Sequence, residues 1–176
     1  QLLDCLNPNH LVNHFCEVEY YYSFLKIYNG IQMKAKNCLI FGGSGQIGRS
    51  LIRKLTRNNY RVTVVTRNIH QKSYKIKTQA NAGYIEIIEA SIFDEKKIRN
   101  LFKKADICIN LIGILFEKRG GNTFKNIHSV LPSLLAKLCK EYNLKHFIHL
   151  SALGINDATD SDYAKSKLEG EGNILK

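Results

Sequence analysis

The chain has 176 residues, of which 44% are apolar and 23% are charged, with 26 Lys and Arg against 15 Asp and Glu. This length suits one domain, or one domain with part of another, and the composition excludes general disorder and low complexity. No run of about 18 apolar residues occurs, so no membrane-spanning helix is expected. The net charge of +11 suits a nucleic acid, an anionic membrane face or a polyphosphate ligand, and charge alone does not choose among them.

The first 32 residues differ in composition from the rest of the chain. They hold one Lys and three acidic residues, whereas the remaining 144 hold 25 basic and 12 acidic ones. The only methionine, Met33, precedes a short basic lead and the first strong apolar run. We therefore expect residues 1–32 to be an extension outside the core and residues 33–176 to form the domain. His10 and His14 have the i, i+4 spacing of helical metal ligands, but no further ligand pattern follows, so no metal is expected.

The five cysteines are scattered and include no Cys-x-x-Cys pair, which argues against a disulfide framework and a structural zinc site. Cys38, Cys108 and Cys139 fall within apolar runs and are expected to be buried thiols. The N-terminus lacks the pattern of a secretory signal, because three acids and a single Lys precede Gly30. These features predict a reducing compartment, most simply the cytoplasm.

From residue 37 onward, apolar and β-branched runs alternate with amphipathic stretches. The runs predict buried strands at 37–41, 61–66, 84–88, 106–112 and 146–150. The stretches predict helices at 46–58, 94–104, 122–142 and 162–175, with a polar connection between the second and third strands. Pro132 should kink the third helix or mark a second helical start.

This alternation predicts an α/β fold, a doubly wound parallel sheet of the Rossmann type, with five strands in the order 3-2-1-4-5. In such sheets the ligand lies outside the carboxyl ends of the strands, near the point where the strand order reverses. Here that point falls between the first and fourth strands.

A glycine-rich turn follows the first strand, in the segment Phe41-Gly-Gly-Ser-Gly-Gln-Ile-Gly48. Gly42, Gly45 and Gly48 allow a tight strand-to-helix turn and let backbone N–H groups approach a diphosphate, while Gly43 adds room. The start of the following helix favours negative charge. Because the turn ends a strand and opens an amphipathic helix, it has the context of a dinucleotide-binding loop.

The second strand ends without the acidic residue that binds the ribose 2′-hydroxyl in NAD-specific sites. Between Gly48 and Glu86 the chain has no Asp or Glu, whereas it has nine Lys and Arg. One of the nine, Arg67, directly follows the second strand, where a guanidinium can hold a 2′-phosphate. The pattern favours NADP(H), with NAD(H) as the alternative.

A Ser, a Tyr and a Lys form a further constellation near the end of the chain. Ser151 follows the fifth strand, and Tyr163 and Lys167 lie four residues apart on the last predicted helix, so they share a face. The ammonium would lower the pKa of the phenol, which makes Tyr163 a usable proton donor or acceptor near neutral pH. Ser151 could hydrogen-bond a substrate carbonyl or alcohol. Ser151, Tyr163 and Lys167 are therefore the candidate catalytic residues.

Together these motifs resemble the short-chain dehydrogenase/reductase superfamily, in its extended or atypical branch of epimerase- and dehydratase-like proteins. Three segments are similar, more narrowly, to the nucleotide-binding accessory subunit of respiratory complex I (NADH:ubiquinone oxidoreductase) and its bacterial relatives. These segments are Asn110-Leu-Ile-Gly113, Phe147-Ile-His-Leu-Ser-Ala-Leu-Gly154 and Tyr163-Ala-Lys-Ser-Lys-Leu-Glu-Gly-Glu171. The resemblance extends over about residues 35–174.

The resemblance implies a tightly held NADP(H), with Tyr163 and Lys167 near the nicotinamide ribose. Where the family often has an Asp that reaches the adenine amino group, this chain has Ser91, and the Ile92 backbone would substitute for it; Asp94 is expected to cap the next helix. The full set of expected cofactor residues is Gly42, Gly43, Ser44, Gly45, Gln46, Ile47, Gly48, Arg67, Ser91, Ile92, Leu111, Ile112, Gly113, Tyr163 and Lys167.

Family members continue past the Tyr-x-x-x-Lys helix, so we expect this chain to lack the C-terminal strands and the substrate region. The resemblance implies a nucleotide used structurally, with a membrane respiratory complex or quinone-pathway proteins as partners. The location would be the inner face of the plasma membrane or the matrix side of an organelle. The alternative is an NAD(P)H-dependent oxidoreductase or epimerase in the full-length form, with Tyr163 as acid and base. A nucleic-acid-binding module is a distant alternative, because Lys and Arg are dispersed and no aromatic-plus-basic motif occurs.

Overall fold

The computed structural model describes residues 35–158 and 160–175, so the extension predicted over residues 1–32, with its two histidines, lies outside the described residues. Five parallel strands form one sheet in the order β3-β2-β1-β4-β5, which confirms the predicted fold class and strand order. The strands are β1 (Asn37–Phe41), β2 (Arg61–Thr66), β3 (Ile85–Glu89), β4 (Ile107–Asn110) and β5 (His146–His149). The helices are α2 (Gln46–Arg57), α3 (Ile69–Lys77), α4 (Glu95–Phe102), the π-helix η2 (Lys125–Val130), α5 (Leu131–Glu141) and α6 (Asp162–Ile174).

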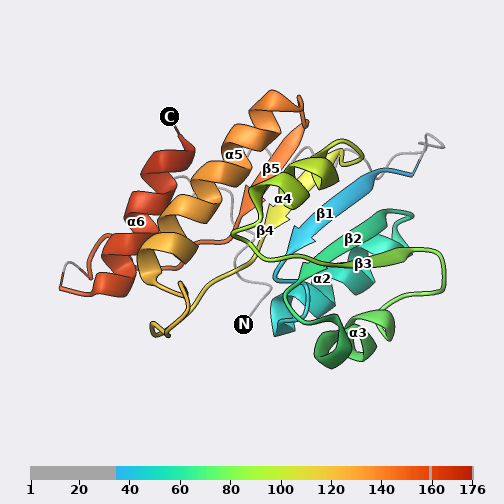
Figure 1. The fold of residues 1–176 in the computed structure, drawn as a ribbon, viewed down its shortest axis with the longest axis horizontal. Helices are drawn as coiled ribbons and strands as arrows, with labels where there is room; N and C mark the ends of the chain where they lie inside the picture. The colour runs from blue at the N-terminus through green and yellow to red at the C-terminus, as the bar shows by residue number, and fades with distance from the viewer. Residues whose placement is uncertain (1–34, 159, 176) are drawn as a thin grey trace, which may run out of the picture. The chain divides into compact units, whose positions relative to one another are not determined.

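Helices cover both faces of the sheet, as alternating β and α segments require (Figure 1). On one face, α2 and α3 pack through Ile52, Leu55 and Ile76 onto alternate residues of β1, β2 and β4. On the other face, α4, η2 and α5 pack onto the remaining alternate residues, including Leu39 and Phe41. Because side chains of a strand point alternately to the two faces, the central strands read as continuous apolar runs.

The three cysteines expected in the core, Cys38, Cys108 and Cys139, are buried thiols as predicted. Burial raises the pKa of Cys38 to about 12, with the charge of Asp106 adding to the effect. A thiol held in its protonated form is a poor nucleophile. These cysteines therefore serve packing.

Two features of the fold differ from the sequence-based expectation. The segment expected as a polar connection contains α3, which begins after Asn68, whose side chain accepts a hydrogen bond from the Gln71 backbone N–H. The long helix predicted at 122–142 is divided into η2 and α5, and Pro132 lies in the first turn of α5, at the second helical start that was one of the two expectations. Pro is tolerated there because the first turn of a helix has no intrahelical partner for its N–H groups. None of the described helices is long and apolar enough to span a membrane.

Candidate functional site

The glycine-rich turn lies between β1 and α2, and its close contacts require glycine. Gly42 has φ +85°, and a Cβ there would lie 2.9 Å from the Leu111 carbonyl carbon. At Gly48 a Cβ would lie 2.6 Å from the Gly42 oxygen and from the Gly43 Cα. At Gly43 it would lie 2.7 Å from a methyl group of Val64. These contacts bring the start of α2 against the end of β1, as the sequence predicted for a phosphate-binding turn.

Among the glycines of this turn, Gly45 is the one with room for a side chain. A Cβ at Gly45 would meet only the Gly42 oxygen, at 3.4 Å, and its φ of −71° suits any residue. No side chain caps the start of α2, and no acidic residue lies in its first turn. The first N–H groups of a helix lack intrahelical partners and attract anions. The turn therefore offers an anion site above Gly45, beside Ile47, which is 57% exposed.

The connection that follows β4 lies directly beside this turn. The Leu111 N–H donates to the Phe41 oxygen at 2.9 Å, and a Cβ on Gly42 would lie 3.1 Å from the Ile112 nitrogen. The buried Asn110 side chain accepts from the Ile112 N–H at 3.1 Å and so fixes the turn. The structure thus brings the expected cofactor residues of β1 and β4 together, at the switch point of the sheet.

One face of α6 packs against η2 and positions the Tyr and the Lys of the predicted constellation. The face includes Ser166, Gly170 and Asn173, whose spacing is that of one helix stripe. A Cβ at Gly170 would lie 1.8 Å from the His128 carbonyl oxygen, so only glycine fits there. Asn173 Nδ2 donates to Ser129 Oγ at 2.9 Å. This packing fixes the rotation and height of α6, and with them the positions of Tyr163 and Lys167.

Lys167 is a buried ammonium at the centre of the site. Its side chain is 3% exposed, and Nζ donates to the Leu150 oxygen at 3.1 Å. A Cβ built on Gly113 would lie 3.6 Å from Nζ, so the Lys also reaches the connection after β4. Burial lowers the pKa of Lys167, while the carboxylate of Glu171 acts in the opposite direction. The structure therefore places the Lys167 ammonium at the Leu150 carbonyl, directly before Ser151, and near Gly113.

His128 is a buried residue that sequence reasoning missed. Its Nε2 accepts from the Ile114 N–H at 3.0 Å, so Nδ1 carries the proton and donates to Ser166 Oγ at 2.9 Å. Ser166 in turn donates to the Tyr163 carbonyl oxygen, and the Tyr163 ring meets the imidazole edge-on, with centroids 5.2 Å apart. Burial and then the charge of Lys167 lower the pKa of His128 to about 4, so the ring is neutral at physiological pH.

Two buried polar atoms near Lys167, at the carboxyl-end edge of the sheet, have no hydrogen-bond partner among the described residues: Ser151 Oγ and His149 Nε2. Asn110 uses its oxygen for Ile112, so its amide faces His149 Nδ1 at 3.1 Å and leaves the proton on Nε2. Burial, followed by the nearby Lys167 and His128, lowers the pKa of His149 to about 4. Buried donors are normally satisfied, so these atoms fit a polar group of a ligand.

At the other side of this sheet edge, beyond β2 and β3, Arg67 and Ser91 are exposed. Arg67 Nη1 donates to Asn122 Oδ1 at 2.6 Å. Ser91 uses its hydroxyl to accept from the Phe93 N–H, while the Ile92 side chain is buried in the core. Of the expected adenosine-side residues, Arg67 offers charged donors to a ligand, and the Ser91 hydroxyl keeps one neutral O–H donor.

An acidic residue lies nearer to this end than the sequence indicated. Glu89, at the end of β3, pairs in register with Thr66, and its Oε2 accepts from the Ile69 N–H at 3.2 Å. The sequence pattern was considered only for acidic residues at the end of β2, so Glu89 on the neighbouring strand was missed. The carboxylate caps the first turn of α3, next to Arg67.

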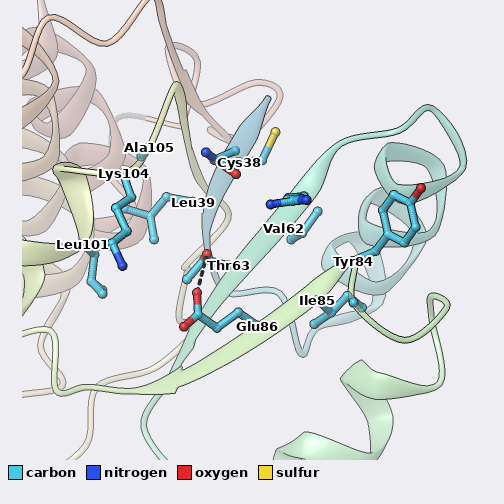
Figure 2. Close-up of a pocket in the computed structure, with 13 residues that line it drawn as sticks. Cys38, Leu39, Val62, Thr63, Tyr84, Ile85, Glu86, Leu101, Lys104 and Ala105 are labelled. Atoms are coloured by element: carbon cyan, nitrogen blue, oxygen red, sulfur yellow. Dashed lines mark hydrogen bonds between the residues drawn. The ribbon is translucent and has the colours of Figure 1, made fainter. Parts of the chain in front are cut away.

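A cavity of about 470 Å³ is formed at the opposite end of the strands, between α4 and the starts of β1, β2 and β3 (Figure 2). Thr63 donates to Glu86 beside it, and Leu101 of α4 and Lys104, which follows α4, line one side. Ligands of doubly wound sheets bind at the carboxyl ends, so this cavity is separate from the glycine turn and Lys167. Within residues 35–158 and 160–175, no group of three or more His, Cys, Asp or Glu side chains is arranged to hold a metal ion.

The geometry defines a class: a Rossmann-type domain with a glycine turn at the switch point and a Ser, Tyr and Lys set beyond β5. A match to the NmrA-like family covers residues 34–169, and the chain belongs to this family. This confirms the predicted relationship to extended or atypical short-chain dehydrogenases/reductases.

Curated relatives agree with the narrower resemblance. The chain is 24% identical over 132 residues to the mitochondrial NADH-ubiquinone oxidoreductase 40 kDa subunit of Neurospora crassa, a match that covers 75% of this chain and 35% of that protein. It is 27% identical over 135 residues to the mitochondrial NADH dehydrogenase [ubiquinone] 1 alpha subcomplex subunit 9 of Mus musculus, covering 77% and 36%. The chain thus spans about a third of the length of these relatives.

Solved structures share the fold. A UDP-glucuronic acid 4-epimerase from Bacillus cereus, in complex with NAD, superposes with a TM-score of 0.67 at 20% identity, over 79% of this chain and 51% of that one. A wide-type short-chain dehydrogenase/reductase from Veillonella parvula, in complex with NADP, gives 0.59 at 17% identity, over 81% and 64%. Both similarities establish the fold alone.

Proposed function

We propose that the described domain binds a nicotinamide dinucleotide, with NADP(H) preferred over NAD(H), and that the nucleotide serves a structural role in an accessory subunit of a respiratory complex. The diphosphate lies over Gly45 and the first turn of α2. The adenosine 2′-phosphate lies at Arg67, and the nicotinamide ribose lies between Lys167 and Ser151. When bound, the nucleotide supplies hydride chemistry; the residues described here bind and orient it.

The observation that carries dinucleotide binding is the arrangement of two separated features at the carboxyl-end edge of one sheet. The glycine turn offers unpartnered N–H groups, and the far end offers the ammonium of Lys167 together with the unpartnered Ser151 hydroxyl. A mononucleotide or a lone phosphate would use only the turn. A dinucleotide uses both features, which lie on the two sides of the switch point.

The preference for NADP(H) is supported by charge at the end of β2. Arg67 is exposed, and no acidic residue follows β2 in the sequence before Glu86. Glu89 is the one carboxylate that contacts this loop, and it is engaged by the Ile69 N–H. A guanidinium favours a phosphate over a hydroxyl by charge and by its paired donors.

The structural role and the partner are supported by the relatives, which are named as subunits of NADH–ubiquinone oxidoreductase. We infer a membrane-bound respiratory complex as the partner, with quinone-pathway proteins as the second candidate, and the matrix side of an organelle as the location. The alternative function is an oxidoreductase or epimerase. It is supported by the intact Ser151, Tyr163 and Lys167 set, in which Tyr163 would transfer a proton.

The test is analysis of the nucleotide that copurifies with the chain, by native mass spectrometry, followed by titration of the stripped protein. We expect NADPH or NADP⁺. Gly45→Val should abolish binding while leaving the thermal midpoint near that of the wild type, because the site has room for a Cβ but not for a diphosphate as well. Bound RNA, or equal binding by Gly45→Val, would contradict the proposal.

The alternative is tested with a carbonyl panel and NADPH. We expect no turnover by this chain, with or without the Tyr163 hydroxyl. Reduction of a carbonyl that Tyr163→Phe abolishes would establish the enzyme in place of the structural role, since a positioned proton donor is typically worth about 10²–10⁴-fold in rate.

A further inference from the structure

The connection between β4 and η2 folds into a short hairpin, which the sequence did not predict. Lys118 and Asn122 form an antiparallel bridge, in which the Lys118 N–H donates to the Asn122 oxygen at 3.0 Å. Gly120 and Gly121 form its tip, with φ of +82° and +83°. At its base, the Phe124 N–H donates to Glu117 Oε1 at 2.6 Å. Backbone and side-chain bonds thus give the hairpin a defined shape.

The hairpin follows β4 in the chain and reaches across the carboxyl-end edge of the sheet to the segments that follow β2 and β3. Asn122 accepts from Arg67, which lies 55 residues away after β2. A Cβ on Gly121 would lie 3.0 Å from the ring of Phe93, in the segment that follows β3. The hairpin therefore lies beside the ends of β2 and β3, where the adenosine of a dinucleotide would lie under the proposed function. It also holds the Arg67 guanidinium there.

Asn122 holds Arg67 without using up its donors. A guanidinium has five N–H groups, and the bond to Asn122 takes one of them, on Nη1. The asparagine oxygen carries no net charge, so it orients the cation without neutralising it. An aspartate at this position would form an ion pair and would repel a phosphate.

The hairpin also carries a second cation on the face that presents Asn122. Residues directly opposite each other in an antiparallel bridge project to the same face, so the Lys118 side chain emerges beside that of Asn122. Lys118 is exposed, and its ammonium rests over the Phe116 ring, 5.4 Å from the centroid. A flexible four-carbon stem lets the ammonium turn toward an anion next to Arg67.

We propose that Arg67, Asn122 and Lys118 form a subsite for a phosphomonoester, the 2′-phosphate of NADP(H), in which Asn122 is a positioning residue for the Arg67 guanidinium and Lys118 supplies the second positive charge. This proposal rests on the proposed function. It assigns to the hairpin a selectivity that the end of β2 alone would otherwise carry.

The experiment measures the affinity of the full chain for four probes: NADPH, NADH, adenosine 2′,5′-bisphosphate and 5′-AMP. We expect Asn122→Ala to weaken NADPH and the bisphosphate about 3–10-fold, and Asn122→Asp about 10–100-fold, as for loss of an oriented charged hydrogen bond. NADH and 5′-AMP should change less than about twofold. Lys118→Ala should weaken the phosphorylated probes about 3–10-fold, and more than the matched charge removal Arg119→Ala at the neighbouring position.

Positioning is separated from direct contact by the double variant Arg67→Ala/Asn122→Ala. If Asn122 acts through Arg67, the double variant should bind NADPH as Arg67→Ala does, with no additional loss. Selective weakening by Arg67→Ala together with wild-type affinity in Asn122→Ala would overturn the hairpin subsite and leave the NADP(H) preference intact. Equal effects of Arg67→Ala on NADPH and NADH would overturn both, and no binding of any probe would overturn dinucleotide binding itself.

Discussion

At the β4–β5 side of the sheet's carboxyl-end edge, Lys167, His128 and Asn110 are each at most 3% exposed. Each of these side chains makes a hydrogen bond to a backbone group. At the β2–β3 side, Arg67 and Ser91 are exposed. A buried polar network is rigid, because each broken bond leaves an unsatisfied group. An exposed cation costs little to change and is screened by salt. The comparison teaches that the two sides suit different tasks. Under the proposed function, the buried side would orient the nicotinamide ribose of either nucleotide, and the exposed side would distinguish NADPH from NADH.

The largest effect is expected from crowding the buried side. Gly170→Ala would place a Cβ 1.8 Å from the His128 oxygen, which neither backbone can relieve without moving α6. Overpacking of this kind costs about 1–3 kcal/mol or more, and we expect the upper end or an unfolded protein. Gly172→Ala is the control, since a Cβ there meets nothing within 4 Å and alanine improves helix propensity. Equal midpoints for the two variants in thermal denaturation would mean that α6 does not depend on this contact.

A second substitution should weaken nucleotide binding at the buried side without destabilising the fold. Lys167→Met removes the ammonium and keeps the length of the side chain. We expect NADPH and NADH to bind about 10–100-fold more weakly, and to the same extent, while the midpoint stays equal or rises, because a buried charge is removed. Lys165→Met, on the exposed face of the same helix, should change neither affinity. A selective loss of NADPH alone would place the 2′-phosphate at Lys167.

Reversing a charge on the exposed side should have the complementary result. Arg67→Asp should weaken NADPH about 10–100-fold by losing a charged hydrogen bond and adding repulsion, while NADH gains a ribose acceptor and changes little. Arg61→Asp, at the other end of the same strand and also exposed, is the matched control. The preference for NADPH over NADH in the wild type should shrink as salt rises. Equal weakening of both nucleotides by Arg67→Asp would show that selectivity is set elsewhere.

The last effect is confined to acidic solution. Burial lowers the pKa of His128 to about 4 from an ordinary 6.5, so between these values the unfolded chain binds the proton and the folded chain does not. Stability is therefore complete above about pH 6.5 and falls as the pH drops toward 4, by on the order of 1–3 kcal/mol. His128→Gln, which keeps an acceptor for Ile114, should reduce this slope in denaturant melts from pH 7 to 4. An unchanged slope would mean that His128 does not titrate with folding.

Much of the fold could be predicted because single segments carry the signal. The runs that form β1, β2 and β4 are apolar on both faces, and α2 repeats apolar residues at helical spacing. Helix α3 was missed because Ile76 is its one buried residue. An Asn68-x-x-Gln71 pattern, typical of a helix start, was the available signal. The π-helix could not be predicted, because its contact with Gly170 depends on a helix that lies far along the chain.

The residues of the candidate site likewise divide into those found in local motifs and those whose partners are distant in sequence. Gly42, Gly45, Gly48, Tyr163 and Lys167 belong to local motifs, in the turn after β1 and on α6. His128, Asn122 and Glu89 were missed because each acts through a partner that is distant in sequence. Their partners are Ser166, Arg67 and Ile69. No spacing rule connects such pairs, since the order of the strands brings them together.

The most direct test of the account is calorimetric titration of the stripped full chain with NADPH and NADH at low salt. The account predicts saturable 1:1 binding of both nucleotides, with NADPH bound about 10-fold or more tightly, because both use the glycine turn and Lys167 whereas only NADPH has a phosphate for Arg67. Equal affinities would contradict the division of tasks between the two sides. The absence of binding by either nucleotide would contradict the function itself.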